Sequence, residues 1–201
     1  MSRLVLILAR SGTGKSTSLR NFKKGEAQVV LCSGKELPIK TDLATVVPKN
    51  YAELYRLIAG ADAPVVVLDD LNYMLSYREM ELASTVGYQK FSIMAVELFN
   101  VFKAIIDKPG DQIFYLMAHA ADTAEGDNQL KFKTTGKMLS EKIVLEGLTN
   151  IVIGADVIDG DFVFKVKTDG TGIKTPIGMF TTDTVPNDLK AVNKAIKEFY
   201  E

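Results

Sequence analysis

A lysine that follows two glycines, directly after an apolar run, is the first feature of this sequence with the residue types for chemistry. The run Leu4–Leu8 reads as a buried strand, and the stretch SGTGKST follows it, before a helix-like segment over 15–22. Glycines let the backbone wrap a phosphate, so that several N–H groups and the positive end of a helix dipole point at one spot. The lysine then reaches the β- and γ-phosphates, and the hydroxyl that follows it can ligate Mg²⁺. The spacing predicts a nucleotide phosphate-binding loop.

The predicted nucleotide-binding residues continue from the end of this strand into the helix: Ala9, Arg10, Ser11, Gly12, Thr13, Gly14, Lys15, Ser16 and Thr17. The pattern is G-x-x-x-x-G-K-[ST] with one departure, because Ala9 stands where the first glycine belongs. We interpret Ala9 as tolerated, since that position mainly needs a small residue at the strand exit. Lys15 is also a catalytic candidate, because it brings positive charge to the place where negative charge develops in phosphoryl transfer. The expected cofactors are ATP and Mg²⁺.

Two carboxylates follow a second apolar run, PVVVLDD, which spans 64–70. P-loop proteins hold the Mg²⁺ shell with an Asp at the tip of a strand that emerges beside the phosphate loop. Asp69 comes first after the run, so Asp69 and Ser16 are the predicted metal residues. Asp70 is then a candidate to polarise the attacking water. An Asp pair that only caps a helix is the alternative interpretation.

Length and composition favour a soluble, intracellular protein with one domain over residues 1–201. The chain has a net charge of −1 and a single cysteine, Cys32, which cannot form an internal disulfide and fits a buried strand position. It shows no N-terminal signal stretch and no apolar run long enough to span a bilayer, so no membrane partner is expected. The near-neutral charge gives no global attraction to nucleic acid, and any such binding would need a local basic patch.

Strands alternate with helices along the chain, which predicts an α/β fold with a mainly parallel sheet flanked by helices. The expected strands are 4–8, 27–31, 64–68 and 113–118, and the expected helices are 15–22, 51–59 and 89–107. Asp159–Gly160, followed by the alternation in FVFKVK, predicts a C-terminal β-hairpin. The segment 172–189 reads as a loop, and Asn187 or Asp188 is placed to cap a final helix that ends at Tyr200.

The chain resembles the small phage-encoded P-loop ATPases of the RecA-like, AAA-type class, some of which are called Sak-type single-strand annealing ATPases. The matching pieces span nearly the whole chain: SGTGKST, VVVLDD, GYQKF, YLMAH, TTGKMLSEK and KTPIGMF…VPNDL. The resemblance implies a P-loop NTPase with a bare RecA-like core that acts on single-stranded DNA in recombination or annealing. It also implies rings or filaments with nucleotide at the subunit interface, in the cytoplasm of an infected bacterial host. Unlike RecA, the protein is expected to lack an N-terminal oligomerisation helix and a C-terminal domain.

The resemblance also suggests a catalytic base and a phosphate sensor. Glu36 follows the second strand, where RecA-like ATPases carry a catalytic glutamate, so Glu36 and Asp70 are rival bases; the alternative for Glu36 is a solvated loop carboxylate. His119, the only histidine, ends the strand 113–118, where many ATPases place a γ-phosphate sensor, and it replaces the usual glutamine. A capping or surface histidine is the alternative there.

Two groups of lysines are assigned by the same resemblance. The stretch 120–137 follows the sensor strand, where RecA-like proteins place a DNA-binding loop. There Lys131, Lys133 and Lys137 would contact phosphates and Phe132 would stack on a base, or the stretch is an ordinary solvated loop. RecA-like proteins also complete the site of a neighbouring subunit with lysines from late strands. Lys167 and Lys174 are the candidates for this catalytic role in trans, whereas Lys165 is expected on the solvated face of the hairpin.

Two other classes of function are alternatives. A small-molecule or nucleoside kinase would normally close an arginine-rich lid over the transferred phosphate, but the last arginine here is Arg78. A nucleotide-dependent partner or scaffold protein would make no DNA contact. Stimulation of ATP turnover by single-stranded DNA distinguishes these classes.

Overall fold

The computed structural model describes residues 2–121, 129–135 and 143–201. Its strands are β1 (Arg3–Ala9), β2 (Ala27–Leu31), β3 (Ala44–Val46), β4 (Val65–Asp69), β5 (Ile113–His119), β6 (Ile151–Ile158), β7 (Asp161–Lys165) and β8 (Thr184–Pro186). Its helices are the 3₁₀ segments η1 (Ser16–Asn21) and η3 (Leu145–Leu148) and the α-helices α1 (Tyr51–Ala59), α2 (Asn72–Glu81), α3 (Gln89–Ile106) and α4 (Leu189–Tyr200).

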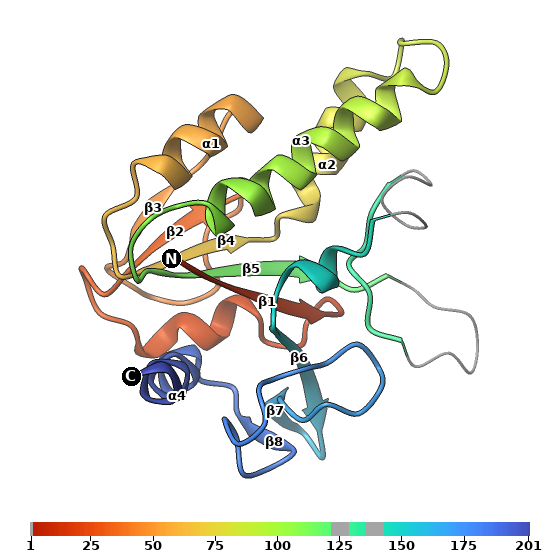
Figure 1. Ribbon diagram of the computed structural model, residues 1–201. Coiled ribbons are helices and arrows are strands. Elements are labelled where there is room, and N and C mark those ends of the chain that lie inside the picture. The colour runs from red at the N-terminus through yellow and green to blue at the C-terminus, as the bar shows by residue number, and fades with distance from the viewer. Residues whose placement is uncertain (1, 122–128, 136–142) are drawn as a thin grey trace.

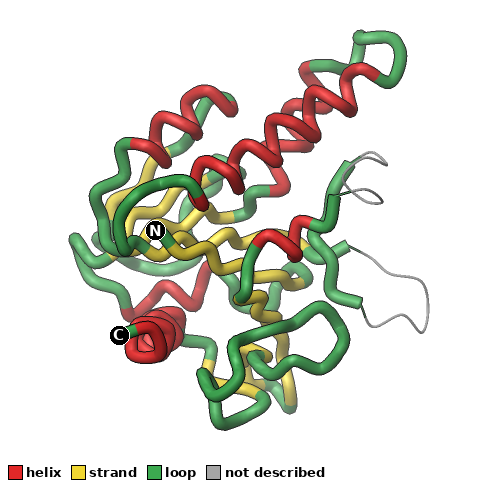
Figure 2. Tube along the Cα trace, in the orientation of Figure 1, coloured by secondary structure: helices red, strands yellow, loops and turns green. Residues whose placement is uncertain are grey.

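The strands form one sheet in the order β3-β2-β4-β5-β1-β6-β7-β8. Every pair from β3 to β6 is parallel, whereas β7 and β8 each run antiparallel to the strand before them. Helices α1, α2 and α3 lie over one face of the sheet, and α4 lies with η1 over the other (Figures 1 and 2). The predicted fold class, a mainly parallel α/β sheet flanked by helices with a C-terminal β-hairpin, is confirmed.

The two faces of the sheet explain why its central strands are mainly runs of apolar residues. Along β1, the side chains of Leu4, Leu6 and Leu8 belong to the core under α1, α2 and α3, while Val5 and Ile7 belong to the core under η1 and α4. A strand buried on both faces has no position for a polar residue. In the described parts of the chain, none of the helices is both long and apolar enough to cross a membrane.

The local expectations with a clear pattern are confirmed. Strand β2 has the predicted bounds, β1 is one residue longer at each end, β4 is shifted by one residue along the chain, and β5 ends one residue later than expected. Strands β6 and β7 form the expected hairpin, in which Asp159 and Gly160 have φ of 52° and 88°. Positive φ at both central residues is what a two-residue hairpin turn needs, and Asp-Gly supplies it at low cost. Cys32 is buried as expected, although it lies directly after β2 and not within a strand.

Other elements differ from the sequence expectation. The helix expected over 15–22 is the shorter 3₁₀ segment η1, in which the Ser18 hydroxyl donates to the Lys15 carbonyl and competes with regular helix bonding. Helix α2 was not expected, because only three of its residues are buried and they form no helical stripe. Strands β3 and β8 have three residues each, too few for an apolar run, and β8 lies in the segment expected to be a loop.

Candidate nucleotide site

The phosphate loop leaves β1 at Ala9 and enters η1 at Ser16. Ala9 is 1% exposed and pairs with neighbouring strands on both sides, so a small side chain suits this position. Gly12 and Gly14 have φ of 79° and 86°, a conformation that side chains other than glycine adopt at a cost. The loop curls around the carbonyl of Arg10, which accepts hydrogen bonds from the Thr13 hydroxyl at 2.9 Å and from Lys15 Nζ at 3.3 Å.

Lys15 is a buried cation inside this loop. Only 6% of the residue is exposed, and burial lowers the pKa of its ammonium, although the charges of Asp70 and Asp69 act in the opposite direction. The neighbouring carboxylates favour the charged form of Lys15, and an ammonium that has lost most of its water is well placed to bind an anion. The loop therefore holds its positive charge where the sequence pattern predicts a phosphate.

The predicted metal residues meet across the sheet edge. The Ser16 hydroxyl lies 2.9 and 3.0 Å from the two carboxylate oxygens of Asp69. Strand β5 lies between β4 and β1 in the sheet. The carboxyl ends of the parallel strands nevertheless share one edge, and Asp69 still reaches the loop. Burial and the neighbouring Asp70 raise the pKa of Asp69 to about 6, whereas Ser16 and Lys15 lower it.

The geometry of the site agrees with the fold class. A glycine loop follows the central strand, its lysine is buried, and its serine contacts an acid from a second parallel strand. The chain has the fold of a RecA-like P-loop NTPase. Ser16 and Asp69 supply the hydroxyl and carboxylate oxygens that Mg²⁺ prefers, so the P-loop residues fit this cation.

Asp70 and His119 lie together at the same edge of the sheet. Asp70 has a φ of 56°, and its Oδ1 lies 3.4 Å from Nε2 of His119, which ends β5. The rings of His119 and Tyr73 make an edge contact with centroids 6.1 Å apart. Burial, and then the charge of Lys15, lower the pKa of His119, against the opposing effect of Asp70. The two residues predicted to act as base and sensor therefore form one contact pair.

Glu36, the rival base, lies elsewhere. It occupies the loop after β2, its side chain is exposed, and it makes no hydrogen bond or ion pair within the described parts of the chain. The structure thus brings Asp70, and not Glu36, into contact with His119.

Asn72 is a site residue that the sequence analysis missed. Its side chain accepts a hydrogen bond from the backbone N–H of His119 and donates one to the carbonyl of Lys133. Asn72 is buried at the start of α2 and joins the end of β5 to the segment around Lys133. The only signal in the sequence is its place two residues after the carboxylate pair, which carries no pattern of its own.

The prediction that Phe132 stacks on a nucleic-acid base is wrong. Phe132 is only 4% exposed, and its ring packs against Phe102 of α3 with centroids 6.2 Å apart. Its backbone forms a β-bridge with Ala120, directly after β5, and this pairing directs the side chain into the core. Phe132 lies between two lysines in the sequence, but it is buried because its segment pairs with the residue after β5 as a short strand-like piece.

The lysines on either side of Phe132 are exposed. The backbone N–H of Lys133 donates to the His119 carbonyl at 3.0 Å, and the Lys131 carbonyl accepts from Ala121 at 2.7 Å. Both lysines are therefore held next to the predicted sensor. Lys137 lies outside the described residues.

Three lysines in and after β7, namely Lys165, Lys167 and Lys174, have different surroundings. Lys165 pairs with Asp156 of β6 on the solvated side of the hairpin, as expected. Lys167 is exposed and pairs with Asp183 at 2.8 Å. Lys174 is half-buried, and its backbone is hydrogen-bonded to β6.

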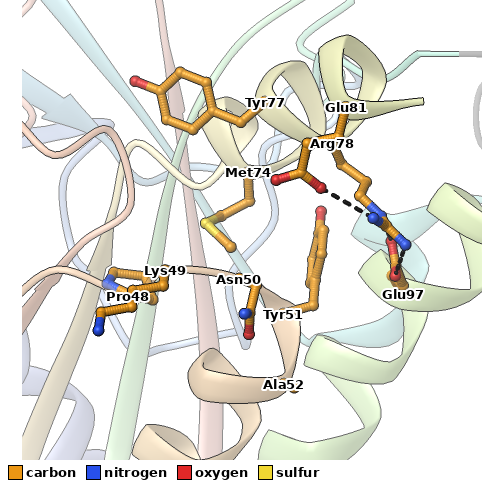
Figure 3. A pocket seen from close by; sticks show the side chains of 10 residues that line it. All are labelled: Pro48, Lys49, Asn50, Tyr51, Ala52, Met74, Tyr77, Arg78, Glu81 and Glu97. Atoms are coloured by element: carbon orange, nitrogen blue, oxygen red, sulfur yellow. Dashed lines mark hydrogen bonds and ion pairs between the residues drawn. The ribbon is translucent and has the colours of Figure 1, made fainter. Parts of the chain in front are cut away.

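Two cavities flank the sheet edge. One, of about 450 Å³, lies next to the phosphate loop, with Arg10, Thr13 and Lys165 in its wall. The other, of about 350 Å³, lies at the start of α1 and contains the Arg78–Glu97 ion pair (Figure 3). None of the residues that the sequence analysis assigned to the nucleotide site lines the second cavity, so the first is the one associated with the P-loop.

Comparison with known proteins yields structural similarity only. No family model matches the chain, and no curated protein matches its sequence. An ATPase from the type III secretion system of pathogenic bacteria has a TM-score of 0.44 and 14% identity, over 78% of this chain and 51% of that one. The Legionella pneumophila ATPase DotB has a TM-score of 0.40 and 15% identity, over 98% of this chain and 51% of that one. The chain spans about half the length of either structure.

Proposed function

We propose that this protein binds and hydrolyses ATP with Mg²⁺. The observation that carries the proposal is the contact between Ser16 and Asp69, which joins the phosphate loop to the acid of β4. A buried Lys15 lies within the same loop. The P-loop supplies the hydroxyl and the ammonium, and β4 supplies the carboxylate, that a Mg²⁺-bound triphosphate needs.

Each residue has a defined task in this proposal. Lys15 binds the β- and γ-phosphates, and Ser16 and Asp69 hold Mg²⁺, which when bound neutralises the charge of the phosphate oxygens. Asp70 orients and polarises the attacking water. His119, whose lowered pKa keeps it neutral near pH 7, responds to the γ-phosphate through hydrogen bonding.

We further propose that the ATPase acts on single-stranded DNA through Lys131 and Lys133, in recombination or annealing. The resemblance to phage RecA-like ATPases suggests this role, and the position of both exposed lysines supports it. They flank the buried Phe132 and are bonded to the end of β5, so DNA bound there would lie next to His119. Phe132 then anchors the segment and makes no contact with a base.

The decisive experiment measures ATP turnover with and without single-stranded DNA. Wild type should hydrolyse ATP and turn over faster with DNA, whereas Lys15→Ala should abolish hydrolysis, because no charge then faces the γ-phosphate. The matched control is Lys24→Ala, an exposed lysine that no contact ties to the loop. Full turnover in Lys15→Ala would refute the ATPase assignment. A rate of ATP turnover that does not change when single-stranded DNA is added would favour the partner or scaffold alternative.

The DNA contact is tested by the salt dependence of binding. Replacing Lys131 and Lys133 with alanine should reduce the slope of log K against log salt by about 1.4, since each lost phosphate contact on a single strand removes about 0.7. The double variant Lys40→Ala, Lys49→Ala removes two exposed charges elsewhere and should keep the slope. An unchanged slope in the Lys131/Lys133 variant would exclude this segment from the DNA interface.

A further inference from the structure

Two side chains from the C-terminal part of the chain rest on the phosphate loop. A methyl group placed on Gly14 would lie 2.8 Å from Cδ1 of Phe162 and 3.3 Å from both amide atoms of Asn187. Phe162 belongs to β7, and Asn187 follows β8. Both therefore touch the loop at the residue directly before Lys15.

Phe162 and Asn187 form one unit. The backbone N–H of Asn187 donates to the carbonyl of Phe162 at 3.2 Å, and Arg20 of η1 donates to the carbonyl of Asn187 at 2.6 Å. The ring of Phe162 is 49% exposed although it packs on the loop. An aromatic ring that is fixed at its backbone and open to solvent is a surface on which a second ring can stack.

The amide nitrogen of Asn187 lacks a partner, whereas its Oδ1 accepts from Arg20 at 3.5 Å. The residue is 2% exposed, and its Nδ2 is a buried donor without a hydrogen bond in the described parts of the chain. A buried donor in this state is unfavourable, and an acceptor from a ligand would satisfy it. The half-exposed ring of Phe162 meets the same point of Gly14.

The sheet order shows which part of a nucleotide would arrive there. Strands β5 and β4, with His119 and Asp69, lie on one side of β1, and β6, β7 and β8 lie on the other. The metal-binding end of the triphosphate faces Asp69. Its nucleoside end must therefore leave the loop toward Phe162 and Asn187.

We propose that Phe162 and Asn187 form the nucleobase side of the nucleotide site, where a purine stacks on the ring and a purine nitrogen accepts from Asn187 Nδ2. This inference rests on the proposed nucleotide binding. A donor is satisfied equally by adenine and guanine nitrogens, and a purine covers more of the ring than a pyrimidine. The site thus binds purine triphosphates without strong choice between adenine and guanine, and more weakly those of pyrimidines.

The experiment compares two probes by calorimetry with the full chain and Mg²⁺: ATP, and inorganic tripolyphosphate, which has no base. Wild type should bind ATP about tenfold more tightly than tripolyphosphate, the magnitude expected for one stacked base. Phe162→Ala and Asn187→Leu should each remove most of this preference while tripolyphosphate binding changes by less than twofold. Phe162→Trp should keep it. Phe199→Ala, which removes an aromatic of similar exposure from α4, is the matched control and should keep both affinities.

The outcomes separate this inference from the proposed function. If wild type binds neither probe, the nucleotide site itself is refuted, and the inference with it. If Lys15→Ala loses both probes but Phe162→Ala and Asn187→Leu keep the wild-type preference for ATP, the P-loop assignment stands and the nucleobase assignment is overturned. A pyrimidine triphosphate that binds as tightly as ATP would also overturn it. Thermal unfolding of each variant establishes that a lost preference is not a lost fold.

Discussion

Asp69 is a carboxylate whose position costs the protein stability. Burial first, and the neighbouring Asp70 second, raise its pKa from 3.8 to about 6. A carboxyl group with a raised pKa in the folded state binds its proton more tightly there than in the unfolded chain. The folded state is therefore favoured by this group at low pH, and the advantage disappears as the pH rises from about 4 to about 6. At pH 7 the buried charge is a cost, which a bound cation would relieve.

Asp69→Asn should therefore stabilise the protein while it abolishes Mg²⁺-dependent hydrolysis. Without Mg²⁺ at pH 7, we expect the free energy of unfolding in urea to rise by about 1–3 kcal/mol, because the amide carries no charge and can still accept from Ser16. The gain should vanish near pH 4, where Asp69 is protonated. The control Asp42→Asn changes an exposed carboxylate and should leave the unfolding free energy unchanged. A destabilised Asp69→Asn variant would contradict this account of the buried charge.

Helix α4 connects three distant elements through its first residues. The Asp188 carboxylate caps the helix by accepting from the backbone N–H groups of Lys190 and Ala191 at 3.0 and 3.3 Å, and it accepts from the Asn21 side chain of η1 at 2.7 Å. Lys190 pairs with Glu26, just before β2. The start of α4 thus joins β8, η1 and the edge of β2. Asn187, the other cap candidate, is instead directed toward the phosphate loop.

Loss of this cap should weaken the whole fold. Asp188→Ala should lower the free energy of unfolding by about 1–2 kcal/mol, because the first N–H groups of α4 lose their acceptor. Asp188→Ser, which can still cap, should recover most of the loss. Urea unfolding followed by circular dichroism measures both variants. Equal loss in Asp188→Ala and Asp188→Ser would show that the contact with Asn21, and not the cap, is responsible.

At the scale of the whole molecule, the cationic side chains that could complete the site of a neighbouring subunit differ in their exposure and in their ion pairs. Lys167 is exposed but paired with Asp183, and Lys174 is fixed through its backbone to β6. Arg78, the last arginine of the chain, is held by Glu97 and Glu81. We propose assembly into a ring or filament in which Lys174, with Lys167 as the second candidate, completes the site of the next subunit.

A mixing experiment tests this assembly. Lys174→Ala subunits and Lys15→Ala subunits should each be inactive alone, whereas mixtures should regain turnover where an intact loop meets an intact Lys174. The expected recovery is up to about one quarter of wild-type turnover in an equal mixture, because random pairing makes that fraction of interfaces complete. Light scattering establishes that the two variants assemble together. Co-assembled mixtures without activity would exclude Lys174 as a residue that acts in trans.

The sequence by itself determined the features that depend on a few neighbouring residues. The phosphate loop, Asp69 at the end of its strand, the Asp159–Gly160 turn and a helix cap at Asn187 or Asp188 all follow from local chemistry, because backbone conformation at glycine, turn and cap residues depends on adjacent atoms. The strands that are buried on both faces could also be predicted from the sequence, because burial on both faces leaves runs of apolar residues.

Tertiary structure alone decided which distant segments meet. It inserted β5 between β1 and β4, buried Phe132 against Phe102, and left Glu36 exposed while Asp70 met His119. It also placed Asn187 on the phosphate loop. Such pairings form between residues far apart in the chain, and their energies come from packing and hydrogen bonds across elements. No local pattern records them, because a lysine-flanked phenylalanine has the same sequence whether it faces solvent or the core.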